Sequence, residues 1–83
     1  MLTVIFYTRP ACTLCDSALA VVRRVQKRLP FQLDIVDIDT SPGLRALYGA
    51  SIPVVVSEKT ELARSFVDEK NLHRALRRLA AFR

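Results

Sequence analysis

Cys12-Thr13-Leu14-Cys15 stands directly after a short apolar run, residues 2–7, and directly before an amphipathic helical pattern, residues 15–29. These two thiols are the only cysteines in a chain of 83 residues. Residues three positions apart on a helical turn have Cα atoms roughly 5 Å apart, within the range that a disulfide tolerates. A pair this close can open and close without moving the fold, which indicates a working redox couple more than a structural cross-link.

Hydrophobic periodicity on either side of the cysteines predicts a strand and then a helix. Residues 2–7 are short, β-branched and aromatic, as in a buried strand. Residues 15–29 place apolar side chains on one helical face, and Pro30 ends the helix. That face consists of Ala18, Val21, Val22, Val25 and Leu29.

The middle of the chain predicts a second strand and a short helix. In residues 31–38, Phe31, Leu33 and Ile35 alternate with polar side chains. Thr40-Ser41-Pro42 is a helix-start signal, with hydroxyl caps before a proline at the first helical position. The helix is expected to run to about Tyr48, where Gly49 closes it.

The last third predicts a hairpin followed by a helix. Residues 53–57 form a Val-rich third strand, residues 58–60 a turn and residues 61–66 a fourth strand. Asp68 caps the last helix, whose expected buried stripe is Leu72, Ala75, Leu76, Leu79 and Phe82. The order βαβαββα implies an α/β fold, with two parallel strands joined by a right-handed crossover and a final antiparallel pair. We expect a four-stranded mixed sheet flanked by three helices.

Length and composition favour one globular domain. The chain is 51% hydrophobic, too apolar for disorder, and has no run long enough for a membrane span. The apolar start, residues 1–7, lacks the basic region and length of a secretion signal. We therefore expect a cytoplasmic protein, and in a reducing cytosol a close cysteine pair is more often catalytic, redox-sensing or metal-binding than a permanent bridge.

The net charge of +5 comes largely from two basic clusters. They are Arg23, Arg24, Lys27 and Arg28, and Arg74, Arg77, Arg78 and Arg83. Both fall late in expected helices, where cations favour the helix dipole, so solubility and dipole matching explain them first. An acidic partner is the alternative. Because no aromatic residue interleaves the cations as a base-stacking platform, we expect no nucleic-acid partner, and we expect no membrane partner.

Together these elements resemble the thioredoxin superfamily. The resemblance rests on a strand followed by residues 8–15 and a long helix, then Val36-Asp37-Ile38-Asp39, then Ile52-Pro53 before a strand. It is nearest to small bacterial glutaredoxin-like proteins, whose active site often reads Cys-x-Leu-Cys-Asp, here Cys12 to Asp16. The resemblance covers nearly the whole chain and implies one glutaredoxin-like domain, residues 1–83, with a thioredoxin-like fold.

The resemblance also implies roles for the cysteines and for Pro53. Cys12 would be the nucleophile and Cys15 the resolving thiol, because disulfide exchange needs a thiolate and a helix N-terminus stabilises one. Pro53 would be cis and lie against the pair. The cis bond would turn the Ile52 backbone outward, so that its N–H and C=O could pair with an extended substrate.

Three further residues near the pair are candidate substrate contacts. Arg9 adds positive potential near Cys12 or is simply a solvated loop arginine. Leu14 contacts a partner or packs over the sheet edge, and Thr13 shapes the surroundings of the pair.

The chain departs from the glutathione-binding pattern of the family. The usual Gly-Gly-acidic element is replaced by residues 64–68, which contain no glycine, and Thr13-Leu14 replaces the usual Pro-Tyr. We expect no resident cofactor, and glutathione only as a weak co-substrate. Two sulfurs and the distant His73 do not supply the four ligands of a structural zinc site.

The sequence thus predicts a monomeric dithiol–disulfide oxidoreductase. Its substrate would be a disulfide-containing protein or a small thiol, and its electron donor a reductase or glutathione. Two alternatives stay open. One is a redox-regulated binding module, and the other is a glutathione-dependent iron–sulfur carrier with Cys12 as a ligand in a dimer.

Overall fold

The computed structural model describes residues 1–82, so that Arg83 of the second basic cluster lies outside the described residues. The strands are β1 (Thr3–Thr8), β2 (Gln32–Asp37), β3 (Val54–Ser57) and β4 (Thr60–Arg64). The helices are α1 (Thr13–Arg28), the short 3-10 turn η1 (Ile38–Thr40), α2 (Pro42–Tyr48) and α3 (Glu69–Ala81). Apart from η1, this is the predicted order βαβαββα. None of the helices within residues 1–82 is long and apolar enough to cross a membrane.

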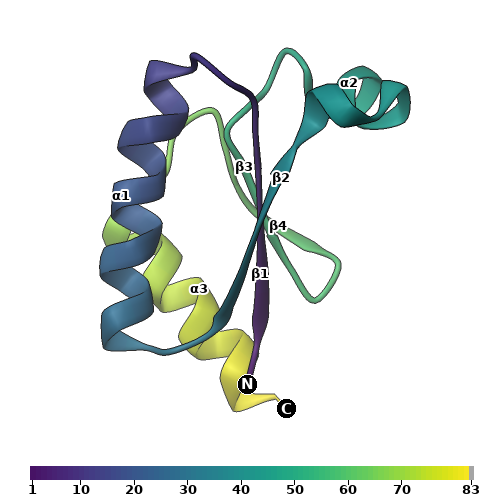
Figure 1. The fold of residues 1–83 in the computed structure, drawn as a ribbon. Coiled ribbons are helices and arrows are strands. Elements are labelled where there is room, and N and C mark those ends of the chain that lie inside the picture. Colours follow the sequence, from purple (N-terminus) through teal and green to yellow (C-terminus); the bar gives the residue numbers. More distant parts are fainter. Residues whose placement is uncertain (83) are drawn as a thin grey trace.

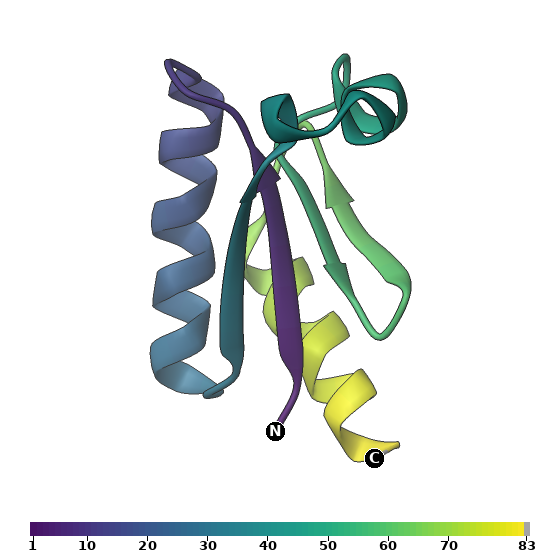
Figure 2. The same ribbon diagram turned by 45° about the vertical axis from the view of Figure 1, so that its right-hand side comes forward.

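The strands form one mixed sheet in the order β2-β1-β3-β4. β1 is parallel to β2 and antiparallel to β3, and β3 is antiparallel to β4. Figures 1 and 2 show α1 and α3 side by side on one face of the sheet, while α2 lies at the other side, near the end where β1 finishes. The predicted four-stranded sheet flanked by three helices is confirmed.

The core lies between the sheet and the pair α1–α3. β1 sends Val4 and Phe6 toward the helices, and neither is more than 1% exposed. The helices meet them with four side chains that are no more than 1% exposed: Val22, Val25, Leu72 and Leu76. Each such side chain contributes about 1.5–3 kcal/mol when fully buried, so this layer is the main source of stability.

Two apolar positions of the expected pattern are exposed. Ile35 pairs in register with Phe6 and so shares its face, but β2 is an edge strand and Ile35 is 46% exposed. Phe82, expected in the buried stripe of the last helix, instead follows α3 as its C-terminal cap and is 84% exposed. The prediction for Phe82 is wrong because the sheet no longer lies beneath the last turn of the helix.

The turns follow their local chemistry. The Ser41 hydroxyl caps α2 by accepting the Leu44 N–H at 3.3 Å, and Asp68 caps α3 by accepting the Asn71 N–H at 2.9 Å. Gly49 follows α2 as expected, in a right-handed conformation with φ −53°. The β3–β4 turn places Glu58 and Lys59 at φ 52° and 61°, as a two-residue hairpin turn requires.

Candidate active site

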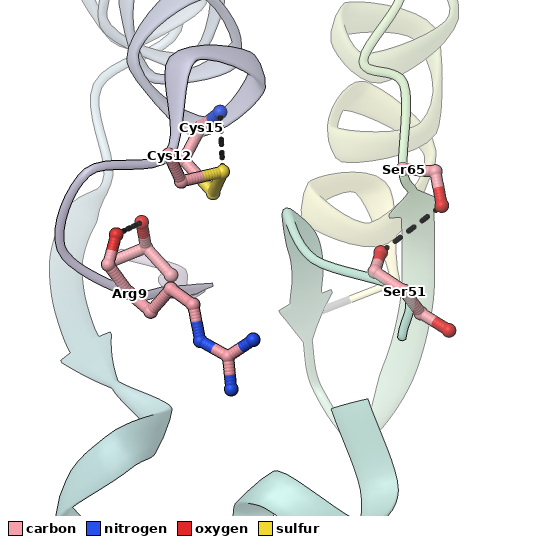
Figure 3. Close-up of a disulfide and its surroundings, with 6 residues drawn as sticks. Arg9, Cys12, Cys15, Ser51 and Ser65 are labelled. Carbon is pink, nitrogen blue, oxygen red and sulfur yellow. Dashed lines mark hydrogen bonds between the residues drawn. A yellow bond between two sulfur atoms is a disulfide. The ribbon is translucent and has the colours of Figure 1, made fainter. Parts of the chain in front are cut away.

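The cysteine pair sits at the junction of β1 and α1. Ala11, in the left-handed region at φ 60°, turns the chain so that Cys12 becomes the N-cap of α1. Cys12 and Cys15 are joined by a disulfide, and their Cα atoms are 5.2 Å apart. Figure 3 shows the bond at the first turn of the helix, where the Cys15 N–H donates to the Cys12 Sγ at 3.2 Å.

The two sulfurs differ in access. Cys15 lies in the core at 2% exposure, whereas Cys12 is half-buried at the surface. The difference follows from position, because the N-cap lies outside the helix and Cys15 lies one turn inside it, above the sheet. An approaching partner would therefore reach Cys12 first.

The first turn of α1 also supplies an electrostatic bias. An α-helix leaves its first N–H groups without intrahelical acceptors and carries a partial positive charge at that end. Here the Cys15 N–H points at the sulfur of Cys12, and the Asp16 N–H donates to the Cys12 carbonyl oxygen at 3.1 Å. The contact from the Cys15 N–H favours negative charge on the Cys12 sulfur, whereas the Asp16 contact is an ordinary backbone bond of the first helical turn.

The Arg9 side chain forms an ion pair with Asp39 and points away from the two sulfurs (Figure 3). Its Nη2 donates to the Asp39 Oδ1 at 3.0 Å, and Figure 3 shows the guanidinium directed away from the disulfide. Asp39 is held in turn by Arg45, whose Nη1 donates to the Asp39 carbonyl oxygen at 3.0 Å. Of the two interpretations of Arg9, the structure supports neither fully. Arg9 is an ion-paired loop arginine, and its charge is largely balanced.

The Ile52–Pro53 bond is cis, as the resemblance implies, and Pro53 is buried. The expected pairing groups of Ile52 are only partly available. Its N–H donates to the Tyr48 carbonyl oxygen at 3.1 Å, so the prediction of a free N–H is wrong: the C-terminal turn of α2 lies next to it. Within residues 1–82, no hydrogen bond to the Ile52 carbonyl oxygen is present.

Ser65 fastens the segment around Pro53 to the end of β4. Its N–H donates to the carbonyl oxygens of Ser51 and Pro53 at 2.9 and 2.8 Å. Its hydroxyl donates to the Ser51 carbonyl oxygen at 3.2 Å, as Figure 3 shows. To do so Ser65 adopts φ 65°, a conformation that favours glycine. A serine thus stands in strained geometry in the stretch compared above with the Gly-Gly of glutathione-binding glutaredoxins.

Two exposed apolar side chains flank this region. Leu14 is 63% exposed and Phe66 74% exposed. A small, mostly apolar hollow of about 160 Å³ lies between them, lined by Leu14, Ser17, Ala18, Val21 and residues 65–67. The sequence placed Phe66 in the fourth strand, whereas β4 ends at Arg64 and Phe66 lies just beyond it.

Other candidate residues take supporting places. Thr13 is exposed as the first residue of α1. Tyr7, half-buried at the end of β1, stacks on Tyr48 of α2 with ring centroids 4.5 Å apart. Burial, and secondly the neighbouring Tyr48, raises the pKa of Tyr7, which keeps the phenol neutral.

Within residues 1–82, no three His, Cys, Asp or Glu side chains come together in a group that could hold a metal ion.

Comparison with known proteins identifies the family. Residues 3–77 match the model of the Glutaredoxin-like domain (DUF836). The chain belongs to this family. It is 31% identical over 70 residues to the uncharacterized protein Rv0508 of Mycobacterium tuberculosis, an alignment that covers 78% of this chain and 72% of that one.

Solved structures agree with this assignment. Protein Ne2328 of Nitrosomonas europaea is 30% identical and superposes with a TM-score of 0.78 over 89% of both chains. Thioredoxin 1 of Thermosipho africanus, at 15% identity, superposes with a TM-score of 0.67 over 96% of both chains, which shows the shared fold. The fold is thioredoxin-like, and a close cysteine pair on this glutaredoxin-like domain supports a redox function.

Proposed function

We propose that this glutaredoxin-like protein is a thiol–disulfide oxidoreductase in which Cys12 attacks and Cys15 resolves. The observation that supports this most is the unequal access of the two sulfurs. Cys12 caps α1 at the surface and accepts the Cys15 N–H at 3.2 Å, whereas Cys15 is 2% exposed. The same turn that hides one sulfur therefore exposes and polarises the other.

The exchange proceeds in two balanced steps. The Cys12 thiolate attacks one sulfur of a substrate disulfide, so that a Cys12–substrate bond forms as the substrate bond breaks. The departing sulfur takes up a proton. Cys15 then gives up its proton and attacks the Cys12 sulfur, which forms the Cys12–Cys15 disulfide and releases the second substrate thiol. Two electrons pass to the substrate. A reductase or glutathione then supplies two electrons to the Cys12–Cys15 disulfide, which restores the two thiols.

The surroundings of the pair favour an extended protein substrate over glutathione. The Ile52 carbonyl oxygen, beside Pro53, is available to accept a hydrogen bond from the substrate backbone. The exposed Leu14 side chain offers the substrate an apolar contact, and Thr13 lies next to Leu14 in the chain. Ser65 and Phe66 occupy the stretch in which the family's glycines leave room. Glutathione then acts as a weak co-substrate at most. Because Arg9 is paired with Asp39, it contributes little to binding the carboxylates of glutathione. The protein acts as a cytoplasmic monomer.

Trapping with single-cysteine variants tests the assignment. Cys15→Ser should accumulate a mixed disulfide with a protein substrate whose disulfides are intact, such as insulin, because the second step is lost. Cys12→Ser should lose disulfide reductase activity by at least about 100-fold, since the remaining thiol is buried. The double variant is the control for background thiols. Full activity of Cys12→Ser, or trapping through Cys15, would overturn the proposal.

A redox-regulated binding module is the second candidate, and one observation favours it. Leu14 lies between the two cysteines in the chain and is 63% exposed. Opening or closing the disulfide would therefore change the position of an exposed apolar side chain that could bind a partner. Turnover separates the candidates, because a module that only switches binds a partner in one redox state but does not reduce its disulfides catalytically. The iron–sulfur alternative is tested by the absorption spectrum after anaerobic reconstitution.

A further inference from the structure

The positive charge of the protein is segregated onto its two long helices. α1 and α3 together carry eight Lys and Arg residues and two carboxylates, Asp16 and Glu69. The rest of the chain carries five Lys and Arg residues and six carboxylates. The net charge of +5 is therefore a property of the helical layer and not of the cysteine end.

Part of that charge converges on a hollow between the helices. A depression of about 490 Å³ lies between the last turn of α1 and the outer side of α3. It is lined by Arg28, Lys70, His73, Arg74, Arg77 and Arg78, with no carboxylate among them. Its size falls in the range of small-molecule sites, about 300–1,000 Å³. This end of α1 is the one away from the cysteines, which lie at the N-cap and in the first turn of the helix.

Dipole matching accounts for only part of this lining. Cations favour the last turn of a helix, which holds Arg78 of α3 and Arg28 of α1. Lys70 lies in the first turn of α3, where a cation opposes the dipole, and Arg74 lies near the middle. Spacings of three and four residues bring all of them onto one side of the helix, about 5–6 Å apart at the Cβ atoms.

The carboxylate of Glu69 pairs with only one cation of the lining, Arg28. Glu69 turns toward α1, where its Oε1 accepts from the Arg24 Nε at 2.9 Å and its Oε2 lies 3.9 Å from the Arg28 Nη1. It thereby ties the two helices together beside the depression. The cations of α3 that line the hollow have no salt bridge within residues 1–82.

We propose that this hollow, between the C-terminal turn of α1 and the basic side of α3, binds a small ligand that carries two or more phosphate groups. Arginine forks match phosphate oxygens in paired hydrogen bonds. A phosphate group carries about 1.5 to 2 negative charges and three acceptor oxygens, against one charge for a carboxylate. A short phosphate chain therefore places enough charge within a hollow of this size, whereas an acidic peptide spreads its charges along its length. This site is independent of the proposed disulfide exchange.

Calorimetric titration of the full chain with inorganic tripolyphosphate tests the site. Binding should occur at one ligand per chain, and Arg74→Gln/Arg77→Gln should weaken it by at least about tenfold. Arg23→Gln/Lys27→Gln is the control, matched in charge, because both residues are exposed on α1 but do not line the hollow. It should change the affinity less than about twofold. Raising NaCl from about 50 to 300 mM should weaken binding, since the lining is open to solvent.

Two further probes distinguish the ligand classes on the wild-type chain. Hexaglutamate should bind at least about tenfold more weakly than tripolyphosphate, and a 16-base-pair DNA duplex should not compete more strongly than tripolyphosphate at equal phosphate concentration. Equal binding of hexaglutamate would assign the surface to an acidic protein partner, and tighter binding of the duplex to nucleic acid. Either result, or an unchanged affinity in Arg74→Gln/Arg77→Gln, would overturn the proposal.

Discussion

The two ends of the α1 helix present opposite surfaces. At its N-terminal end, beside the disulfide, nearby cations are paired, as Arg9 with Asp39 and Arg64 with Glu61. Two large apolar side chains, Leu14 and Phe66, are exposed there. At its C-terminal end, cations gather around a hollow without a carboxylate. On the functions proposed above, we expect partners to reach the cysteines through shape and apolar contact, and charged ligands to bind at the other end of the helix.

The two ends are also held differently. The helical layer is fixed by apolar packing, in which Val22, Val25, Leu72 and Leu76 are no more than 1% exposed. The cysteine end is assembled from loops joined by hydrogen bonds, with Ser65 as the tie to Ser51 and Pro53. Loops tied in this way leave backbone acceptors and side chains available to a substrate, which a packed layer does not.

The largest expected effect contrasts these two kinds of support. Leu76→Ala should lower the free energy of unfolding by about 2–5 kcal/mol through loss of buried contacts. Ser65→Ala should lower it by only about 1 kcal/mol, the value of one hydrogen bond. Ser65→Gly loses the same bond but relieves the left-handed conformation, worth about 1–2 kcal/mol, and should match the wild type. Urea unfolding measures all three. A loss for Ser65→Gly as large as for Ser65→Ala would show that strain is not stored at Ser65.

The next effect concerns the apolar surface at the cysteine end. Leu14→Ser and Phe66→Ser should each lower kcat/KM for a protein disulfide about fivefold, because each removes about 1 kcal/mol of contact in the complex. The loss should persist in about 0.5 M NaCl, since it is not electrostatic. Leu47→Ser is the control, because Leu47 is 67% exposed on α2 and does not line the hollow beside the cysteines. Equal losses in all three variants would show that general apolarity, and not this surface, matters.

The smallest effect tests the charge pairing of the β4 strand. Two hydrogen bonds from Arg64, at 3.0 and 2.7 Å, hold the pKa of Glu61 below its ordinary value. Because the folded state holds this carboxylate ionised, the stabilisation is present above the ordinary carboxyl pKa. It is lost as pH falls through the lowered value. Glu61→Gln should therefore lower Tm slightly at pH 7.

The size of that Tm difference should change with pH and with the partner. The gap between Glu61→Gln and wild type should close in acid, and it should be absent in an Arg64→Gln background. Thermal melts from pH 7 to acid measure both. A gap that stays constant with pH would show that Glu61 acts through packing and not through its charge.

The sequence by itself determined the elements and the position of the cysteines. Strand and helix periods, Pro30, the Ser41 and Asp68 caps and the spacing of Cys12 from Cys15 are local signals, and the structure confirms them. The resemblance to glutaredoxin-like proteins added the cis bond before Pro53. Such features depend on residues only a few positions apart in the chain, so they can be predicted from the sequence alone.

Only the tertiary structure decided which groups meet across the fold. Ile35 is exposed because β2 is an edge strand, and the Ile52 N–H is engaged because α2 ends beside it. The pairing of Arg9 with Asp39 spans 30 positions, and the hollow near Arg74 needs the end of α1 to lie against α3. These outcomes follow from strand order and helix placement, which many distant contacts set together. No local period or spacing encodes them.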